Sequence, residues 1–106
     1  MAEQMPNGSL GIHTLSKSVG AGSDYSTGIS AMGLFMIQNA SASHEIVLFL
    51  VRKDGIFTVL NEGERSLKFG TDEDNSVCVL VSSEVLHIKN NQSLARTIYL
   101  RGLTLR

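Results

Sequence analysis

Tryptophan is absent from this chain of 106 residues, and cysteine and proline each occur only once. A single cysteine cannot form a disulfide within the chain, nor can it supply the paired thiolates of a cysteine-rich zinc site. Charged residues make up 18% of the sequence, and the net charge of −1 argues against a nucleic-acid-binding protein, which needs clustered lysine and arginine. No apolar run approaches the ~20 residues of a membrane-spanning helix, and the start of the chain lacks the pattern of a signal peptide. We therefore expect a soluble protein without a membrane span and without a nucleic-acid partner.

The first quarter of the sequence differs in composition from the rest. Only Glu3, Lys17 and Asp24 are charged among the first 43 residues, and glycine and serine are frequent up to position 30. Fully extended, residues 1–27 could reach ~90 Å at ~3.3 Å per residue. This composition predicts an extended Gly/Ser-rich arm over residues 1–27 that can lie on a neighbouring subunit, followed by one domain over residues 28–106; an unstructured tail is the alternative reading.

From Gly28 onward the pattern is typical of β-strands. Residues 45–51 (EIVLFLV) form a β-branched and aromatic run that predicts a central strand, and Asp54-Gly55 is a strong hairpin signal. The apolar positions change phase at Gly102, which predicts a β-bulge there. The remaining strands are expected at 28–38, 56–60, 67–69, 77–81, 84–89 and 95–106. A short helix capped by Ser30 competes with the strand at 28–38. Together these segments predict an all-β protein, an antiparallel β-sandwich or jelly-roll-like fold of seven to eight strands.

The residues able to carry catalysis or bind a metal are few and scattered. His13, His44 and His87 have no spacing that brings two imidazoles together, and Cys78 lies in an apolar strand (VCVLV) where it is expected to pack as a small hydrophobe with a raised pKa. The acidic loop at 72–75 is expected to be a solvated turn rather than a calcium site, because it lacks EF-hand spacing. We therefore predict no catalytic residues, no metal, no cofactor and no enzymatic activity.

Several strands are apolar on both faces, and a sandwich of this size covers only part of that surface. A symmetric homo-oligomer that buries the remainder is therefore expected. The candidate interface residues are Met32, Leu34 and Met36 of the first strand, Leu10, Ile12 and Leu15 of the arm, and a small Tyr99/Arg101 patch on the last strand.

Three segments carry a resemblance to a known class of proteins. They are the uncharged strand GISAMGLFMIQ, the hairpin EIVLFLVRKDGIFTVL and the closing strand RTIYLRGLTLR. Residues 28–106 resemble the small all-β structural proteins and fibre-tip domains of tailed-bacteriophage virions. The resemblance implies a structural or host-attachment role in a virion, with other virion proteins and a host-surface glycan as partners, and it assigns no site residue.

Two functions of different classes follow from these observations. The first is a non-enzymatic structural protein of a phage particle, as a tail-fibre, head-fibre or decoration component that assembles through its sandwich and its arm. The second is a monomeric lectin-like or ligand-binding β-sandwich whose loops at 70–76 and 90–93 hold a small glycan. The two readings predict different masses in solution.

Overall fold

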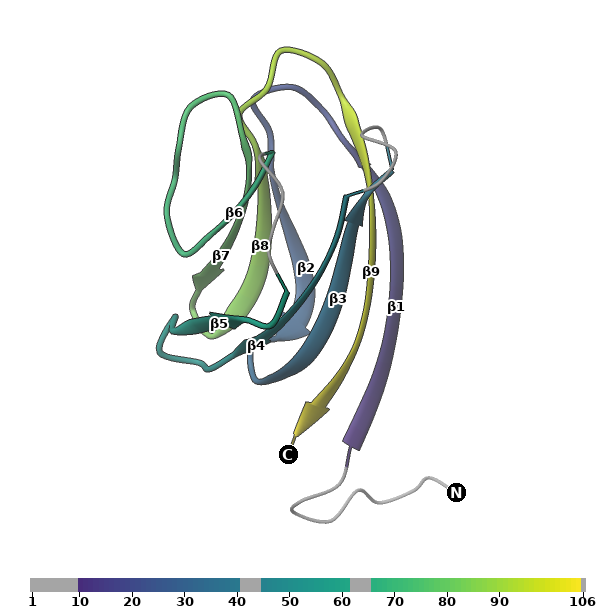
Figure 1. The fold of residues 1–106 in the computed structure, drawn as a ribbon, viewed down its shortest axis with the longest axis vertical. Coiled ribbons are helices and arrows are strands. Elements are labelled where there is room, and N and C mark those ends of the chain that lie inside the picture. Colours follow the sequence, from purple (N-terminus) through teal and green to yellow (C-terminus); the bar gives the residue numbers. More distant parts are fainter. Residues whose placement is uncertain (1–9, 41–44, 62–65, 106) are drawn as a thin grey trace.

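The computed structural model describes residues 10–40, 45–61 and 66–105. Two β-sheets pack face to face as a sandwich (Figure 1). One sheet has five strands in the order β1-β9-β3-β4-β5, and the other has four in the order β2-β8-β7-β6. The predicted all-β sandwich is confirmed. Its strand pairs are antiparallel, with the exception of the parallel pair β6 and β7.

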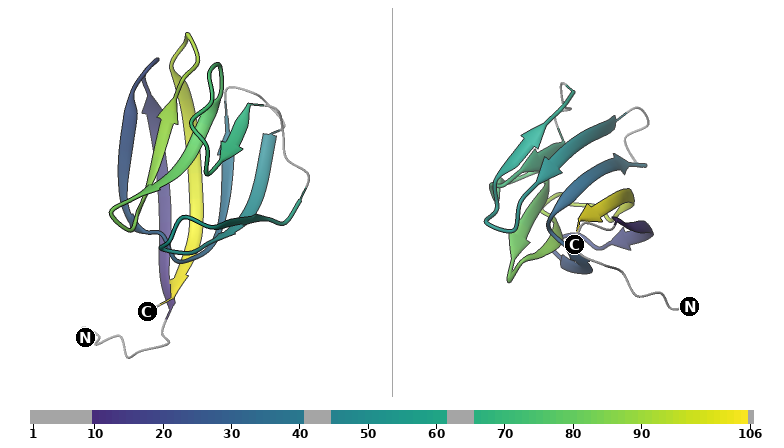
Figure 2. Two further views of the ribbon diagram at one scale, coloured as in Figure 1. Left: turned by 90° about the vertical axis from the view of Figure 1, so that its left-hand side faces the viewer. Right: turned by 90° about the horizontal axis from the view of Figure 1, so that it is seen from below.

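Among the described residues, β1, β3, β4, β5 and β9 form one layer and β2, β6, β7 and β8 form the other (Figure 2). Their bounds are β1 Leu10–Val19, β2 Asp24–Ser30, β3 Gly33–Asn39, β4 Glu45–Val51, β5 Phe57–Val59, β6 Leu67–Phe69, β7 Val77–Ser82, β8 Val85–Asn90 and β9 Arg96–Leu105.

The core lies between the two sheets because successive side chains of a strand point to opposite faces. In β3, Phe35 and Ile37 are fully buried, whereas Met36 between them is 41% exposed. Phe49 is fully buried at the centre of an aromatic cluster, where its ring centroid lies 5.6 Å from that of Phe35, 5.7 Å from Phe57 and 5.0 Å from Phe69. The other sheet contributes Leu67, Val77, Val79, Leu86 and Ile88 to the same core.

The predicted arm over residues 1–27 is wrong for every part of it that the structure describes. β1 pairs with β9 along all ten of its residues, from Leu10 opposite Leu105 to Val19 opposite Arg96, and β2 pairs with β8. The sandwich therefore begins at least as early as residue 10, and the described residues form nine strands instead of seven or eight. β1 is a strand despite its low apolar content, because β9 supplies hydrogen-bonding partners along its whole length. Residues 1–9 lie outside the described residues.

The predicted strand 28–38 is in fact parts of two strands in different sheets. β2 ends at Ser30 and β3 begins at Gly33, and the chain crosses between the sheets at Ala31. Ala31 is fully buried, and its backbone N–H donates to the carbonyl of Glu84 over 2.9 Å. The competing helix does not form.

The β-bulge expected at Gly102 is also absent. Gly102 stands in regular register, opposite His13 of β1 and Phe35 of β3, and it is not among the residues with positive φ. The phase change arises because Leu103 points to the outside, 36% exposed, while Thr104 points inward and is buried. Gly102 itself leaves room for the ring of Phe35, whose nearest carbon lies 2.1 Å from the position a Cβ would take.

Candidate interaction surface

The side of the five-stranded sheet that faces away from the core carries an apolar surface, called here the outer face. It is formed by alternate side chains of β1, β9, β3 and β4, together with Thr58 of β5. Many of these side chains are large and apolar yet 36% exposed or more. The apolar members of the outer face are Ile12, Leu34, Met36, Ile46, Leu48, Leu50, Tyr99 and Leu103.

The strand register places these side chains in rows that run across the sheet. One row passes from Ile12 to Leu103, Leu34 and Leu50, which are direct partners in successive strand pairs. The next row passes from Thr14 to Arg101, Met36 and Leu48. Directly opposed side chains lie ~4.5–5.5 Å apart at Cβ, so each row is a continuous line of contact. The outer face is therefore one contiguous patch.

The patch contains two shallow hollows. One has a volume of about 370 Å³ and lies between Leu34, Leu50, Leu103 and Ile56, with Arg52 at its rim. The guanidinium of Arg52 is paired with Asp54 at 2.6 Å. The second has a volume of about 330 Å³ and lies further along the same face, lined by residues of β1, β9, β3 and β4. Both hollows are lined mainly by apolar side chains and are suited to receiving apolar side chains of another protein.

The structure brings most of the predicted interface residues together. Ile12, Leu34, Met36, Tyr99 and Arg101 all belong to the outer face, and Met32, just before β3, lines the first hollow. Ile12 is the most exposed of the large hydrophobic side chains described, at 81%.

Leu10 and Leu15 do not join this set. Leu15 was expected at an interface, but it packs against the core, because it lies an odd number of residues from Ile12 and so points to the opposite side of β1. Leu10 begins β1 opposite Leu105, within the sheet and not in an extended arm.

Sequence reasoning missed the contribution of β4. Ile46, Leu48 and Leu50 are exposed by 43%, 38% and 42%, and they form the outward side of the strand that the sequence predicts to be central. The alternation within EIVLFLV does not separate the two faces, because both are apolar.

The chemically active side chains do not converge. His13 Nε2 lies 2.9 Å from the hydroxyl of Thr104, and His87 Nδ1 lies 3.2 Å from the carboxylate of Asp24. His44 lies outside the described residues. Within residues 10–40, 45–61 and 66–105, no group of three or more histidine, cysteine or acidic side chains could hold a metal ion.

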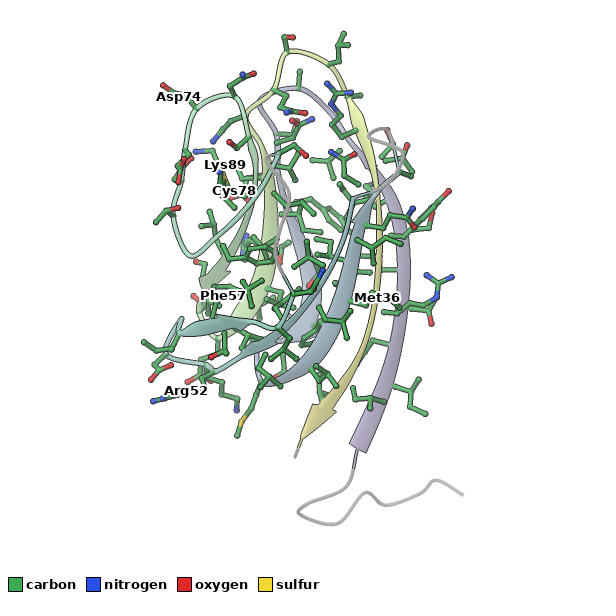
Figure 3. The ribbon with its side chains drawn as sticks, viewed as in Figure 1. Met36, Arg52, Phe57, Asp74, Cys78 and Lys89 are labelled. Carbon is green, nitrogen blue, oxygen red and sulfur yellow. The ribbon has the colours of Figure 1, made fainter. Side chains whose placement is uncertain are left out.

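The acidic loop at 70–76 folds over one face of β7, and the carboxylate of Asp72 is hydrogen-bonded to two side chains outside the loop. Lys89 donates to one carboxylate oxygen of Asp72 over 2.6 Å and the Asn91 amide donates to the other over 2.6 Å. These two hydrogen bonds, that from Lys89 first, lower the pKa of Asp72, and the bond to Asp72 raises the pKa of Lys89. Cys78 lies beneath this loop (Figure 3), fully buried. Burial raises the pKa of the Cys78 thiol, as the sequence predicts.

The loops at 70–76 and 90–93 meet at one end of the sandwich. The amide of Asn91 also donates to the carbonyl of Glu73 over 2.9 Å, and the amide of Gln92 donates to the carbonyl of Asn75 over 3.2 Å. Two segments that were expected to flank a ligand are thus adjacent. Many of their polar groups are, however, already bonded to one another.

Comparison with known proteins adds no relative to this description. No family model, no curated protein and no solved structure matches the chain. The described residues include no helix long and apolar enough to cross a membrane. The chain is accordingly characterised by its fold, an all-β sandwich of a five-stranded and a four-stranded sheet, and by the apolar outer face of the larger sheet.

Proposed function

We propose that this chain is a non-enzymatic structural protein that assembles with further copies of itself, outer face against outer face. Following the resemblance of its strands, we place that assembly in a viral particle, where the chain serves as a tail-fibre, head-fibre or decoration component. The observation that carries the self-association is the contiguous apolar outer face, centred on Met36 and Leu48.

The size of the face supports this reading. Five strands spaced ~4.8 Å apart and central strands of seven residues at ~3.3 Å each give a flat area of roughly 550 Å². Side chains that project from the sheet make the accessible area of the face larger than this flat area. Each partner in a stable complex buries ~800 Å² of accessible area. The largest apolar patch of an ordinary monomer covers ~300–600 Å² and is often functional, and the outer face lies at the upper end of this range.

We favour a second copy of the chain as the partner, because one apolar sheet face can pack against an identical apolar sheet face. Two such sheets can stack ~10 Å apart, as the sheets of a sandwich do. Arg101 is the one charged side chain in the two central rows, and it lies two residues from Tyr99 on β9. An arginine over the face of a tyrosine ring is a favourable contact at an interface, and a two-fold arrangement allows each Arg101 to reach the partner's Tyr99.

The test is the mass in solution of the parent chain and of Met36→Asp, measured by light scattering. An unpaired carboxylate buried at the centre of the contact costs ~3 kcal/mol or more, so association should weaken about 100-fold or more. Leu94→Asp is the matched control, because Leu94 is also large and exposed, at 62%, but lies in the turn before β9. A parent mass of one chain, or an unchanged mass for Met36→Asp, contradicts the proposal.

A second candidate function is a lectin-like or ligand-binding module, favoured by the meeting of the loops at 70–76 and 90–93. This reading predicts a monomer. When a host-surface glycan is added, the NMR resonances of its loops at 70–76 and 90–93 should shift until the site is saturated. The same solution mass separates the two functions, because only the first requires a defined oligomer.

A further inference from the structure

The four edges of the two sheets differ in how readily they can pair with another strand. β5 and β6 have three residues each, which is too short to offer a useful ladder. β2 is interrupted, because its pairing with β8 shifts between Ser26 and Ser30, and Gly28 within the gap has a φ of 74°. Short strands and irregular strands are the usual means by which proteins block edge-to-edge pairing.

β1 is the exception among these edges. It has ten residues, and its register with β9 is regular from end to end. Lys17 is its only lysine, arginine or acidic residue, and Ile12 projects from it with 81% of its side chain exposed. Figure 1 shows β1 at the rim of the five-stranded sheet, with no described strand on its far side. Among the described residues, no strand pairs with its outward N–H and C=O groups, which lie along a regular ladder.

We propose that β1 pairs with β1 of a second copy, antiparallel and across a two-fold axis at Thr14, to form a continuous ten-stranded sheet. A strand of ten residues is matched in length by another copy of itself, and by none of the other three described edges. A two-fold contact of this kind is closed, which is the commonest form of protein association. The inference deepens the proposed function, because it joins the outer faces of two copies into one larger surface.

The charge of Lys17 favours an axis at Thr14 over one at Leu15. In this register Thr14 faces its own copy, and Lys17 faces Gly11. The two Lys17 residues are then six residues apart along the strand, ~20 Å, which is well beyond the screening length of ~8 Å at physiological salt. An axis at Leu15 would instead place Lys17 opposite His13, and two groups that can both be positive oppose such pairing.

The two contacts together predict a tetramer. Pairing through β1 and stacking through the outer face use different surfaces related by different two-fold axes. The first axis runs perpendicular to the sheet and the second parallel to it, and two perpendicular two-fold axes that intersect generate a closed assembly of four chains. The parent mass is then four times the 11.5 kDa of one chain, and Met36→Asp should leave a dimer held by β1.

Cysteine cross-linking tests the β1 contact directly. Thr14→Cys places two thiols opposite each other across the axis, so a mild oxidant such as copper phenanthroline should convert most of the protein to a disulfide-linked dimer. Ser18→Cys is the matched control, because Ser18 is exposed on the same face of β1, but its two copies are eight residues apart, ~27 Å, and should not cross-link. The parent chain treated in the same way controls for Cys78, which is buried.

The outcome for β1 can be separated from the outcome for the outer face by cross-linking Thr14→Cys in the Met36→Asp background. Cross-linking that persists there supports the β1 contact independently of the outer face. A Thr14→Cys protein that does not cross-link, while Met36→Asp still lowers the mass, overturns the β1 inference and leaves the proposed function standing. Efficient cross-linking with a mass that Met36→Asp does not change overturns the outer face and retains β1.

A pair of proline variants in the Thr14→Cys protein gives a second measurement. Successive N–H groups of a strand point to opposite edges, so of Ser16→Pro and Lys17→Pro one removes a hydrogen bond to β9 and the other removes only an outward donor. Both side chains are exposed, and the variant that keeps the parent's thermal stability identifies the outward position. We expect this stable variant to lose cross-linking at least tenfold. A stable variant that still cross-links at the parent's rate overturns the inference.

Discussion

Adding one methyl group at Gly102 should destabilise the sandwich, although nothing in the backbone conformation of this residue requires glycine. Gly102 has no positive φ, so the reason lies in its neighbour on β3. A Cβ at this position would lie 2.1, 2.6 and 2.8 Å from three ring carbons of Phe35. All three distances are well below van der Waals contact.

The magnitude follows from how firmly Phe35 is held. Its ring is 1% exposed and stacks on Phe49 at 5.6 Å with an interplanar angle of 22°, so it cannot tilt away without disturbing the aromatic cluster. Overpacking of a well-packed core costs ~1–3 kcal/mol, whereas the entropic gain of alanine over glycine is only ~0.5–1 kcal/mol. The steric cost prevails, and Gly102→Ala should lower the free energy of unfolding by about 2 kcal/mol.

Urea denaturation followed by circular dichroism measures this change. Gly20→Ala is the control, because a Cβ at Gly20 meets only the side-chain oxygen of Ser23, at 3.3 Å, and its effect should stay within ~0.5 kcal/mol. Phe35→Leu in the Gly102→Ala chain removes the obstructing ring carbons. The double variant should then be more stable than the sum of the two single effects by ~1 kcal/mol or more. Equal stability of Gly102→Ala and the parent, or strictly additive effects with Phe35→Leu, would refute the reasoning.

Three further predictions concern the polar end of the sandwich. Asn90 is fully buried, its amide donates to the carbonyls of Val19 and Leu94 over 2.9 Å each, and its oxygen accepts from the N–H of Gln92. Asn90→Ala should therefore lower the free energy of unfolding, measured by urea denaturation, by about 3 kcal/mol. A loss below ~0.5 kcal/mol contradicts this role. Because the pKa of Asp72 is lowered in the folded chain, its contribution is present above its ordinary value of 3.8 and is lost as the pH falls through the lower folded value. Asp72→Asn should therefore flatten the acid limb of the curve of melting temperature against pH, and an unchanged limb argues against the contribution. Because burial raises the pKa of Cys78, its thiol should react with Ellman's reagent at pH 8 at least tenfold more slowly in the folded protein than in urea, and equal rates would show that the 70–76 loop does not cover it.

The sequence by itself determined the class of fold and most of the strands. The runs at 45–51 and 77–81 are β-branched and flanked by turn residues, and the Asp54-Gly55 signal marks the hairpin between β4 and β5, where Gly55 has a φ of 87°. Such signals are local, because they depend on the alternation of side chains and on the backbone freedom of a few turn residues. Met32, Leu34 and Met36 could be assigned to a shared surface for the same reason.

Only the tertiary structure decided the role of residues 10–27 and of Gly102. β1 has few apolar side chains and becomes a strand because β9, more than 75 positions away in the chain, supplies its hydrogen-bonding partner. Gly102 looks like a bulge in the sequence, but it serves as a space for a ring that arrives from β3. The outer face likewise depends on which strands become neighbours, since Ile12, Leu103, Leu34 and Leu50 form one row only after pairing is complete. These features rest on contacts between distant segments, and no local pattern of residues encodes them.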